Sequence, residues 1–417
     1  MEKLNFTIDG YSFSTAFNTA IDREHCIEEI LSTTGKHYDW FRENTGNKNL
    51  ILYDTEQYEV RNFDDIKYLV LNNRLMDVKT FLCVRRDFKG KLHLPINAST
   101  CSFMFVDINV SEIDLTEFDT TNIVDMDYMF LEADLGDCFS LGSPTNAQAN
   151  TPDRNILTLN TEGVTSMSGM FKDCKVKHLD LNSLRTHNVT DFSDMFCSCN
   201  DLIDLNVDGF DTSNAEDFHG MFQGCIKLTQ LNVKHFNVDN VLHMSCLFSK
   251  CLRLKVIDLE SWNFSQVSDA NEMFAYCEKL EKIIANFNFK MIKEMAFMFC
   301  YCTKLSKVDL SHSDLSHVFD FGYTFFKCEG LKDIRFSQGV WLKAKFTLSM
   351  FDDCKALERL NLPDVILDDV IRSYAMFDDC DNLKEIYMEH PLNLDKYEHE
   401  LIFGNCKAEV KKSTEWQ

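Results

Sequence analysis

The chain has 417 residues, 45% hydrophobic and 26% charged, which is the composition of a folded soluble protein and excludes a disordered one. The net charge is −24, with −2 in residues 1–100 and −22 in the remainder, so direct nucleic-acid binding is disfavoured because the acidic surface would repel phosphates. No stretch reaches the 18 or so apolar residues that a membrane span needs. Since the first residues also lack the pattern of a secretory signal peptide, we expect a cytoplasmic protein, with surface display or secretion by a non-classical route as the alternative.

Residues 1–100 show no repeat and no recognisable motif. Their mixed pattern predicts a small α/β cap domain of unassigned role. Enzyme activity in this segment is a third functional hypothesis, although no catalytic motif supports it.

From residue 101 to residue 406 the sequence repeats with a period of 25 or 26 residues. The marker is Phe-x-x-Cys, which recurs in one frame at Phe171/Cys174, Phe196/Cys199, Phe222/Cys225, Phe248/Cys251, Phe274/Cys277, Phe299/Cys302, Phe325/Cys328, Phe351/Cys354, Phe377/Cys380 and Phe403/Cys406. Two earlier units, centred on Phe105 and Phe130, lack the cysteine. The pattern predicts about twelve units of a solenoid.

Each unit is predicted to contain one short helix and one strand. Apolar residues lie seven, four and one positions before the marker Phe, as in Val189, Phe192 and Met195, and this spacing is typical of a helix. After the marker, Leu-x-x-Leu-x-Leu alternates as a strand does, for example at Leu202 and Leu205. Stacked copies would form an α/β solenoid of the leucine-rich-repeat type, with a parallel sheet on the concave face and short helices outside.

Two segments depart from this period. Between Phe130 and Phe171 the chain has 15 residues more than one unit, which predicts an inserted loop near 138–155. The loop is either tolerated slack or a projecting contact for a partner, because insertions in repeat arrays often map to a binding face. Residues 407–417 are expected to be a C-terminal tail.

The repeat Val-x-x-Met/Phe-x-x-Met-Phe-x-x-Cys-x-x-Leu-x-x-Leu-x-Leu resembles that of the BspA-like leucine-rich repeat surface-protein family. The resemblance covers residues 101–406. It implies a right-handed solenoid that serves in adhesion or protein binding, often at the surface of bacteria.

Two patterns resemble metal sites, and both are better explained by the repeat. Cys197-x-Cys199 and Cys300-x-Cys302 have the short spacing of metal ligands, but one cysteine of each pair is the marker cysteine, a small buried residue. Asp204, Asn206, Asp208 and Gly209 begin like a calcium loop, but the twelfth position is Ala215, not Glu. We therefore predict reduced core thiols, no bound metal and no cofactor.

Outward residues of the predicted strands form the candidate protein-binding site. The side chain between the two strand apolars recurs as a column: Asp180, Asn206, Asn232, Asp258, Asp309, Arg335, Asn361 and Tyr387. A flanking column lies two residues earlier in each strand: Asp204, Gln230, Asp333, Arg359 and Glu385. For a single residue the simpler explanation is a solvated strand face, because most interface contacts contribute little binding energy.

The absence of a catalytic motif in the repeats favours a non-enzymatic scaffold that binds one large, basic protein on its concave face. The alternative is an acidic inhibitor or decoy, of a phage or mobile-element type, that blocks a basic nucleic-acid-binding host protein. The sequence leaves the oligomeric state open.

Overall fold

The computed structural model describes residues 159–337, 344–362, 374–388 and 401–416, shorter stretches between 100 and 157, and the backbone of six strands before residue 100. The chain forms two compact units. Unit 1 comprises residues 1–176 and 183–188, and unit 2 comprises residues 177–182 and 189–417. The repeats from the one marked by Phe196 onward therefore belong to unit 2.

Unit 1 contains the segment predicted as a cap. Its first five strands form two small sheets, β1 (Lys3–Ile8) with β2 (Tyr11–Ala16), and β3 (Leu50–Leu52) with β4 (Tyr68–Leu71) and β5 (Arg74–Asp77). β6 (Gly90–Lys91) pairs in parallel with β7 (Ile113–Asp114), the strand of the first repeat. Parallel stacking thus begins before the predicted boundary at residue 100, and helices predicted in the cap lie outside the described residues.

The inserted loop begins and ends in strands. β8 (Asp134–Leu141) pairs in parallel with β9 (Arg154–Leu157), with Cys138 opposite Arg154. The prediction of a loop over 138–155 is therefore wrong at its two ends, because backbone pairing satisfies the polar groups of residues 138–141. Residues 142–153, the body of the loop, lie outside the described residues.

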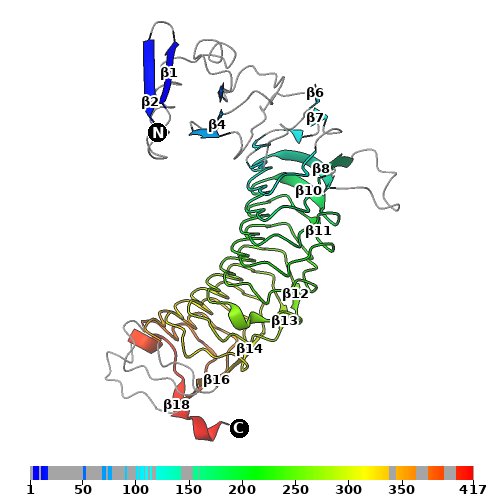
Figure 1. The fold of residues 1–417 in the computed structure, drawn as a ribbon. Helices are drawn as coiled ribbons and strands as arrows, with labels where there is room; N and C mark the ends of the chain where they lie inside the picture. Colours follow the sequence, from blue (N-terminus) through cyan, green and yellow to red (C-terminus); the bar gives the residue numbers. More distant parts are fainter. Residues whose placement is uncertain are drawn as a thin grey trace. The chain divides into compact units, whose positions relative to one another are not determined.

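Unit 2 confirms the predicted solenoid of parallel strands (Figure 1). Its strands are β10 (Lys175–Asp180, whose last four residues belong to this unit), β11 (Asp204–Asn206), β12 (Val256–Leu259), β13 (Lys282–Ala285), β14 (Lys307–Leu310), β15 (Asp333–Phe336), β16 (Arg359–Leu362), β17 (Glu385–Met388) and β18 (Glu409–Lys412). Each described pairing joins residues that are one repeat apart. The predicted tail at 407–417 is wrong, because β18 pairs with β17 and a 3-10 turn, η4 (Ser413–Glu415), follows it.

The segments predicted as short helices are turns in the described repeats. Met195 N–H donates to Phe192 O three residues earlier (3.2 Å), whereas Phe196 N–H donates to Met221 O in the next repeat (2.8 Å). Two residues per turn, such as Asp194 and Ser198, have left-handed φ angles of 55° and 60°. The apolar spacing of three residues is common to a helix and to these turns, so it could not separate them.

The core of unit 2 is built from the marker residues. Rings of the marker Phe stack from repeat to repeat, with centroids 5.2–5.7 Å apart, along Phe196, Phe222, Phe248, Phe274, Phe299, Phe325, Phe351, Phe377 and Phe403. From Cys225 to Cys380 each marker thiol donates to the carbonyl oxygen of the marker Phe one repeat earlier, at 3.0–3.3 Å. All 15 cysteines in the described part of the chain are free. Burial raises the pKa of Cys251 to about 12, so such thiols stay protonated and unreactive.

Candidate protein-binding faces

The outward side chains of the strands, here called the strand face, are the predicted site. Parallel register stacks them as expected, with Asp180 opposite Asn206 and Asp309 opposite Arg335. The flanking column is also formed, as Arg359 opposite Glu385 shows. The repeat that contains Gln230 and Asn232 continues the face without an assigned strand. The structure thus brings the predicted residues together, and their role in binding stays a prediction.

At the start of the strand face, amide groups bridge to carboxylates. Asn206 Nδ2 donates to Asp180 Oδ1 at 3.0 Å, and Asn232 Nδ2 donates to Asp208 Oδ1 at 2.7 Å. The calcium-like residues belong to this ladder: Asn206 lies on β11 and its side chain also accepts a hydrogen bond from Asp208 N–H. The resemblance of these residues to a calcium loop therefore arises because polar residues alternate with apolar ones along the strand.

Further along, charged residues of the strand face pair with each other. Lys234 Nζ lies 3.0 Å from Asp258 Oδ2. Lys307 Nζ lies 3.1 Å from Asp333 Oδ2, and Arg335 Nε lies 3.7 Å from the same oxygen. These side chains are exposed or partly exposed, so each pair contributes little to stability, but together they make this stretch mixed in charge rather than uniformly acidic.

The last predicted residues form a closed network with the C-terminal segment. Arg359 donates to Glu385 Oε2 (2.9 Å) and to the Tyr387 hydroxyl (2.9 Å), which in turn donates to Glu385 (2.7 Å). The guanidinium lies over the rings of Tyr387 (5.1 Å) and Trp416 (4.8 Å). Hydrogen bonds from Lys411 and Tyr387 lower the pKa of Glu385 to about 2. Tyr387 is only 3% exposed, so these residues serve first to attach the C-terminal segment.

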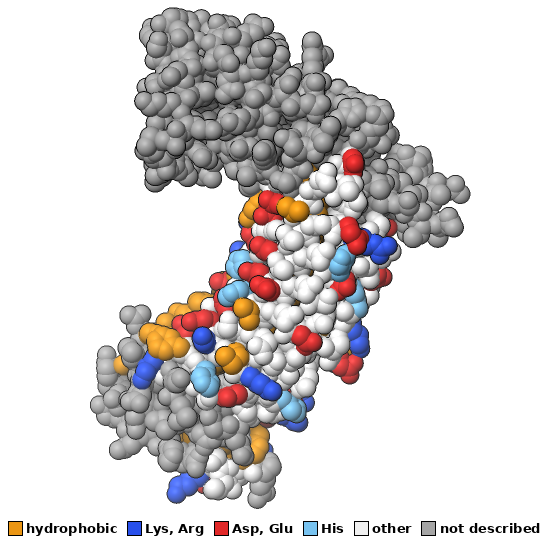
Figure 2. Space-filling model, viewed as in Figure 1, with side chains coloured by type: hydrophobic (Ala, Val, Ile, Leu, Met, Phe, Trp, Pro, Cys, Tyr) orange, Lys and Arg blue, Asp and Glu red, His pale blue; other side chains and the backbone are white. Residues whose placement is uncertain are grey.

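The turns present a second surface, here called the turn face, which the sequence analysis did not single out. One residue per repeat, five positions before the marker Phe, forms a column of β-bridges: Asp191, Asp217, His243, Asp269, Glu294, Asp320 and Phe346. The space-filling view shows acidic and histidine side chains following one edge of the array, with hydrophobic side chains gathering further along it (Figure 2). Burial, with the neighbouring carboxylates of Asp269 and Asp320, raises the pKa of Glu294.

Aromatic side chains occupy the turn face in the repeats marked by Phe274, Phe299 and Phe325. Tyr276 stacks on Tyr301 (4.8 Å between centroids), and Phe297 stacks on Tyr323 (4.7 Å). Phe326 meets both Tyr301 and Tyr323 edge-on at 5.5 Å and joins the two pairs. All five rings are partly exposed, and we call them the aromatic surface.

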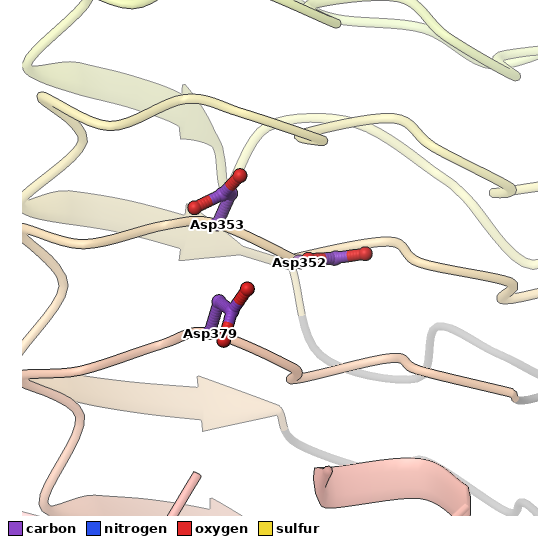
Figure 3. Close-up of side chains that lie close together, drawn as sticks. All are labelled: Asp352, Asp353 and Asp379. Carbon is purple, nitrogen blue, oxygen red and sulfur yellow. The ribbon is translucent and has the colours of Figure 1, made fainter. Parts of the chain in front are cut away.

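Beyond the aromatic surface the turn face becomes acidic again. One carboxylate oxygen from each of Asp352, Asp353 and Asp379 lies within 4.8 Å of the other two (Figure 3). Asp353 is already neutralised, because Lys355 Nζ lies 2.9 Å and Lys327 Nζ 3.7 Å from its oxygens. The three carboxylates therefore form a surface patch in which Asp353 is ion-paired.

Asp352 in this cluster predicts a pH effect on stability. Burial, together with the carboxylates around it, raises the pKa of Asp352 to about 6. The ionised carboxylate is thus disfavoured in the folded state, and stability is lost as the pH rises from about 4 to 6. Asp352→Asn should raise stability at pH 7.5 by about 1 kcal/mol, a value reduced for solvent screening, and the gain should vanish below pH 4.

Thermal unfolding of Asp352→Asn at pH 7.5 and pH 3.8 measures this effect. Asp353→Asn is the matched control, since it removes a carboxylate that lysines neutralise and should bring no gain. An equal gain for Asp352→Asn at both pH values would contradict the assignment.

Comparisons with known proteins place the repeats in a family. A family model described as Mycoplasma protein of unknown function, DUF285, matches residues 97–137, 145–230, 199–309, 242–362 and 278–391. The overlapping matches follow the period, and they confirm that the Phe-x-x-Cys marker belongs to a repeat family. No curated protein matches the chain.

Three of the similar solved structures are leucine-rich repeat proteins of bacteria. One from Bacteroides ovatus is 16% identical, with 83% of this chain and 90% of that chain covered and a TM-score of 0.39. A leucine-rich cell surface protein from Faecalibacterium prausnitzii is 15% identical (66% and 88% covered, TM-score 0.27). A third, from Eubacterium ventriosum, is 12% identical (84% and 94% covered, TM-score 0.33). Within the described part of the present chain, no helix has the length and apolar character to cross a membrane.

Proposed function

We propose that this chain is a non-enzymatic scaffold which binds another protein along the outward faces of its repeats. The chain belongs to the family described as Mycoplasma protein of unknown function, DUF285. One observation carries the proposal. Inward positions are nearly constant from repeat to repeat, whereas outward positions change at almost every step. A solenoid needs only the inward pattern to stack, so the outward variation is available for recognition.

The buried residues leave little chemistry for catalysis. The marker cysteines are protonated and donate to backbone carbonyls, and the marker rings stack on one another. In contrast, Gln230 and Asn232 on the strand face are exposed, as are Asp204 and Arg335. Long extended faces with such mixed polar side chains suit a macromolecular partner better than a small substrate.

Site-specific photo-crosslinking tests the proposal. A photoreactive residue is placed at Asn232 on the strand face or at Lys250 on the turn face, both exposed. Irradiation in lysate of the native host should give a discrete protein adduct from at least one position, and excess unlabelled wild-type protein should abolish it. A probe at buried Leu254 is the matched control and should give none. Failure of wild-type protein to compete at either position would contradict the proposal.

The acidic inhibitor is a second candidate, favoured by the carboxylates of the turn face. Of these, Asp269, Glu294 and Asp320 have no basic side chain of the described residues within ion-pair distance. If the crosslinked partner is a nucleic-acid-binding protein, nucleic acid should compete for it and binding should weaken steeply with salt. Binding that is unchanged by salt and by nucleic acid would eliminate this candidate.

A further inference from the structure

Five aromatic side chains form a continuous surface on the turn face, next to a row of carboxylates. We propose that the aromatic surface, made of Tyr276, Phe297, Tyr301, Tyr323 and Phe326, binds a basic segment of a partner protein whose arginine or lysine side chains stack on the rings. The inference rests on the proposed function and adds the location of the contact and the chemistry of the partner.

The rings have no role in the core. They stay partly exposed, whereas the marker rings are buried and stack on one another. Four of them stand on left-handed backbone, with φ of 61° at Tyr276, 58° at Phe297, 60° at Tyr301 and 57° at Tyr323.

Left-handed backbone is unfavourable for bulky residues, and each such position costs about 1–3 kcal/mol. In an earlier repeat, glycines take the same two turn positions, at Gly220 (φ 58°) and Gly224 (φ 74°). Another repeat places the polar residues Asp194 (φ 55°) and Ser198 (φ 60°) on the same left-handed backbone, so the turn does not require aromatic residues there. Aromatic rings that the turn does not require and that stay partly exposed indicate a recognition surface.

A cation of the chain itself already lies on these rings. Lys327 Nζ is 5.2 Å from the centroid of Tyr301 and 5.6 Å from that of Phe326. Both distances are within the range of a cation–π contact. The electron-rich ring faces of this surface can therefore accept an ammonium or guanidinium group, and the remaining rings offer further faces of the same kind.

Carboxylates lie where a bound cation would need them. Glu272 occupies the same turn position as Phe297 one repeat earlier, and its charge also acts on Tyr276. The column of Asp269, Glu294 and Asp320 runs beside the rings. A guanidinium stacked on Phe297 would lie one repeat along the array from Glu272, a separation of roughly 4.8 Å.

This combination selects a basic protein segment over other ligands. The carboxylates repel phosphate groups, so a nucleic acid would be rejected. A purely apolar partner would leave the carboxylates desolvated and unpaired, which is costly. Arginine satisfies both features, because its planar group stacks on rings and donates to carboxylates at the same time.

Fluorescence anisotropy with a labelled octa-arginine peptide at 150 mM NaCl tests the inference. The double variant Tyr276→Leu/Phe297→Leu keeps apolar side chains and net charge but removes two rings, and it should bind about tenfold more weakly. Glu272→Gln/Glu294→Gln should also lose about tenfold. The variant Asp211→Asn/Asp239→Asn, at two exposed residues outside the candidate binding columns, changes the net charge equally and should lose less than threefold. Unaltered thermal unfolding verifies that each variant is folded.

Other outcomes overturn the inference. If the ring variant binds octa-arginine as the wild type does, or if both neutralised variants lose affinity equally, the peptide is held by overall charge alone. If the wild-type chain instead self-associates through these rings, as a loss of dimer in the Tyr276→Leu/Phe297→Leu variant would reveal by light scattering, the occupant is a second copy. In either case, a crosslink at Asn232 that excess wild-type protein abolishes would still support the proposed scaffold function. The scaffold proposal and the inference about the aromatic surface can therefore fail separately.

Discussion

Phe299→Ala is expected to lower the free energy of unfolding of the repeat array by about 3–5 kcal/mol. The Phe299 ring is fully buried and stacks between Phe274 (5.6 Å, interplanar angle 3°) and Phe325 (5.4 Å, 8°). Alanine would leave a cavity in the middle of the stack, and parallel strands held by backbone pairing on both sides cannot close it. Urea unfolding followed by circular dichroism measures the loss.

Phe319→Ala is the matched control for this experiment. The Phe319 side chain is 45% exposed, with its ring edge-on to Phe346 at 5.2 Å, so its removal should cost less than about 1 kcal/mol. Equal losses for the two variants would show that the stacked marker rings do not form the core of the array.

The parallel solenoid was predictable because its strongest signal is a sequence period, which can be recognised even where single segments show only weak secondary-structure propensity. Ten markers in one frame place equivalent residues one above the other, so the register of strands such as β14 on β15 follows directly. The columns of the strand face follow from the same register. For this reason the sequence predicts strand-face neighbours such as Asp309 and Arg335, whose side chains form an ion pair at 3.9 Å.

The conformation of the turns could not be predicted from the sequence, because the repeat pattern indicates only which residues are buried. Apolar residues three positions apart fit a helix or a series of tight turns, and left-handed angles at residues other than glycine, such as Asp194 and Tyr276, leave no clear mark in a sequence. A signal for the aromatic surface did exist: aromatic residues recur two positions before or after the marker Phe in three successive repeats. It was hidden by the abundance of phenylalanine in the core.

The network at the C-terminus was unpredictable for a different reason. Arg359, Glu385 and Tyr387 lie on repeat strands, but Trp416 lies beyond the last marker, where the period gives no register. Only the pairing of β18 with β17 brings this tryptophan edge-on to Tyr387 at 5.0 Å. Residues predicted as one binding site therefore divide into amides early in the array, ion pairs further along it and a structural network at its end.

Trp262→Ala should destabilise unit 2 by a similar 3–5 kcal/mol, through a second aromatic stack that runs parallel to the marker rings. Trp262 is 3% exposed, and its indole N–H donates to Val233 O at 2.9 Å. It stands at the position held by Phe236 in the preceding repeat, and the two rings stack at 6.4 Å. Loss of the indole would leave both a cavity and a buried carbonyl oxygen without its donor.

Trp262→Phe separates the two contributions, because phenylalanine is the residue that the two preceding repeats carry at this position, as Phe210 and Phe236. It keeps a ring in the stack and removes only the N–H donor, so we expect a loss of about 1–2 kcal/mol. Urea unfolding of both variants, with Phe236→Leu as a volume-reducing control in the same stack, gives the comparison. If Trp262→Phe were as destabilising as Trp262→Ala, the hydrogen bond to Val233 would outweigh the packing of the ring. Tryptophan would then be needed in this repeat for its hydrogen bond to the Val233 carbonyl oxygen, and not for the packing of its ring against Phe236.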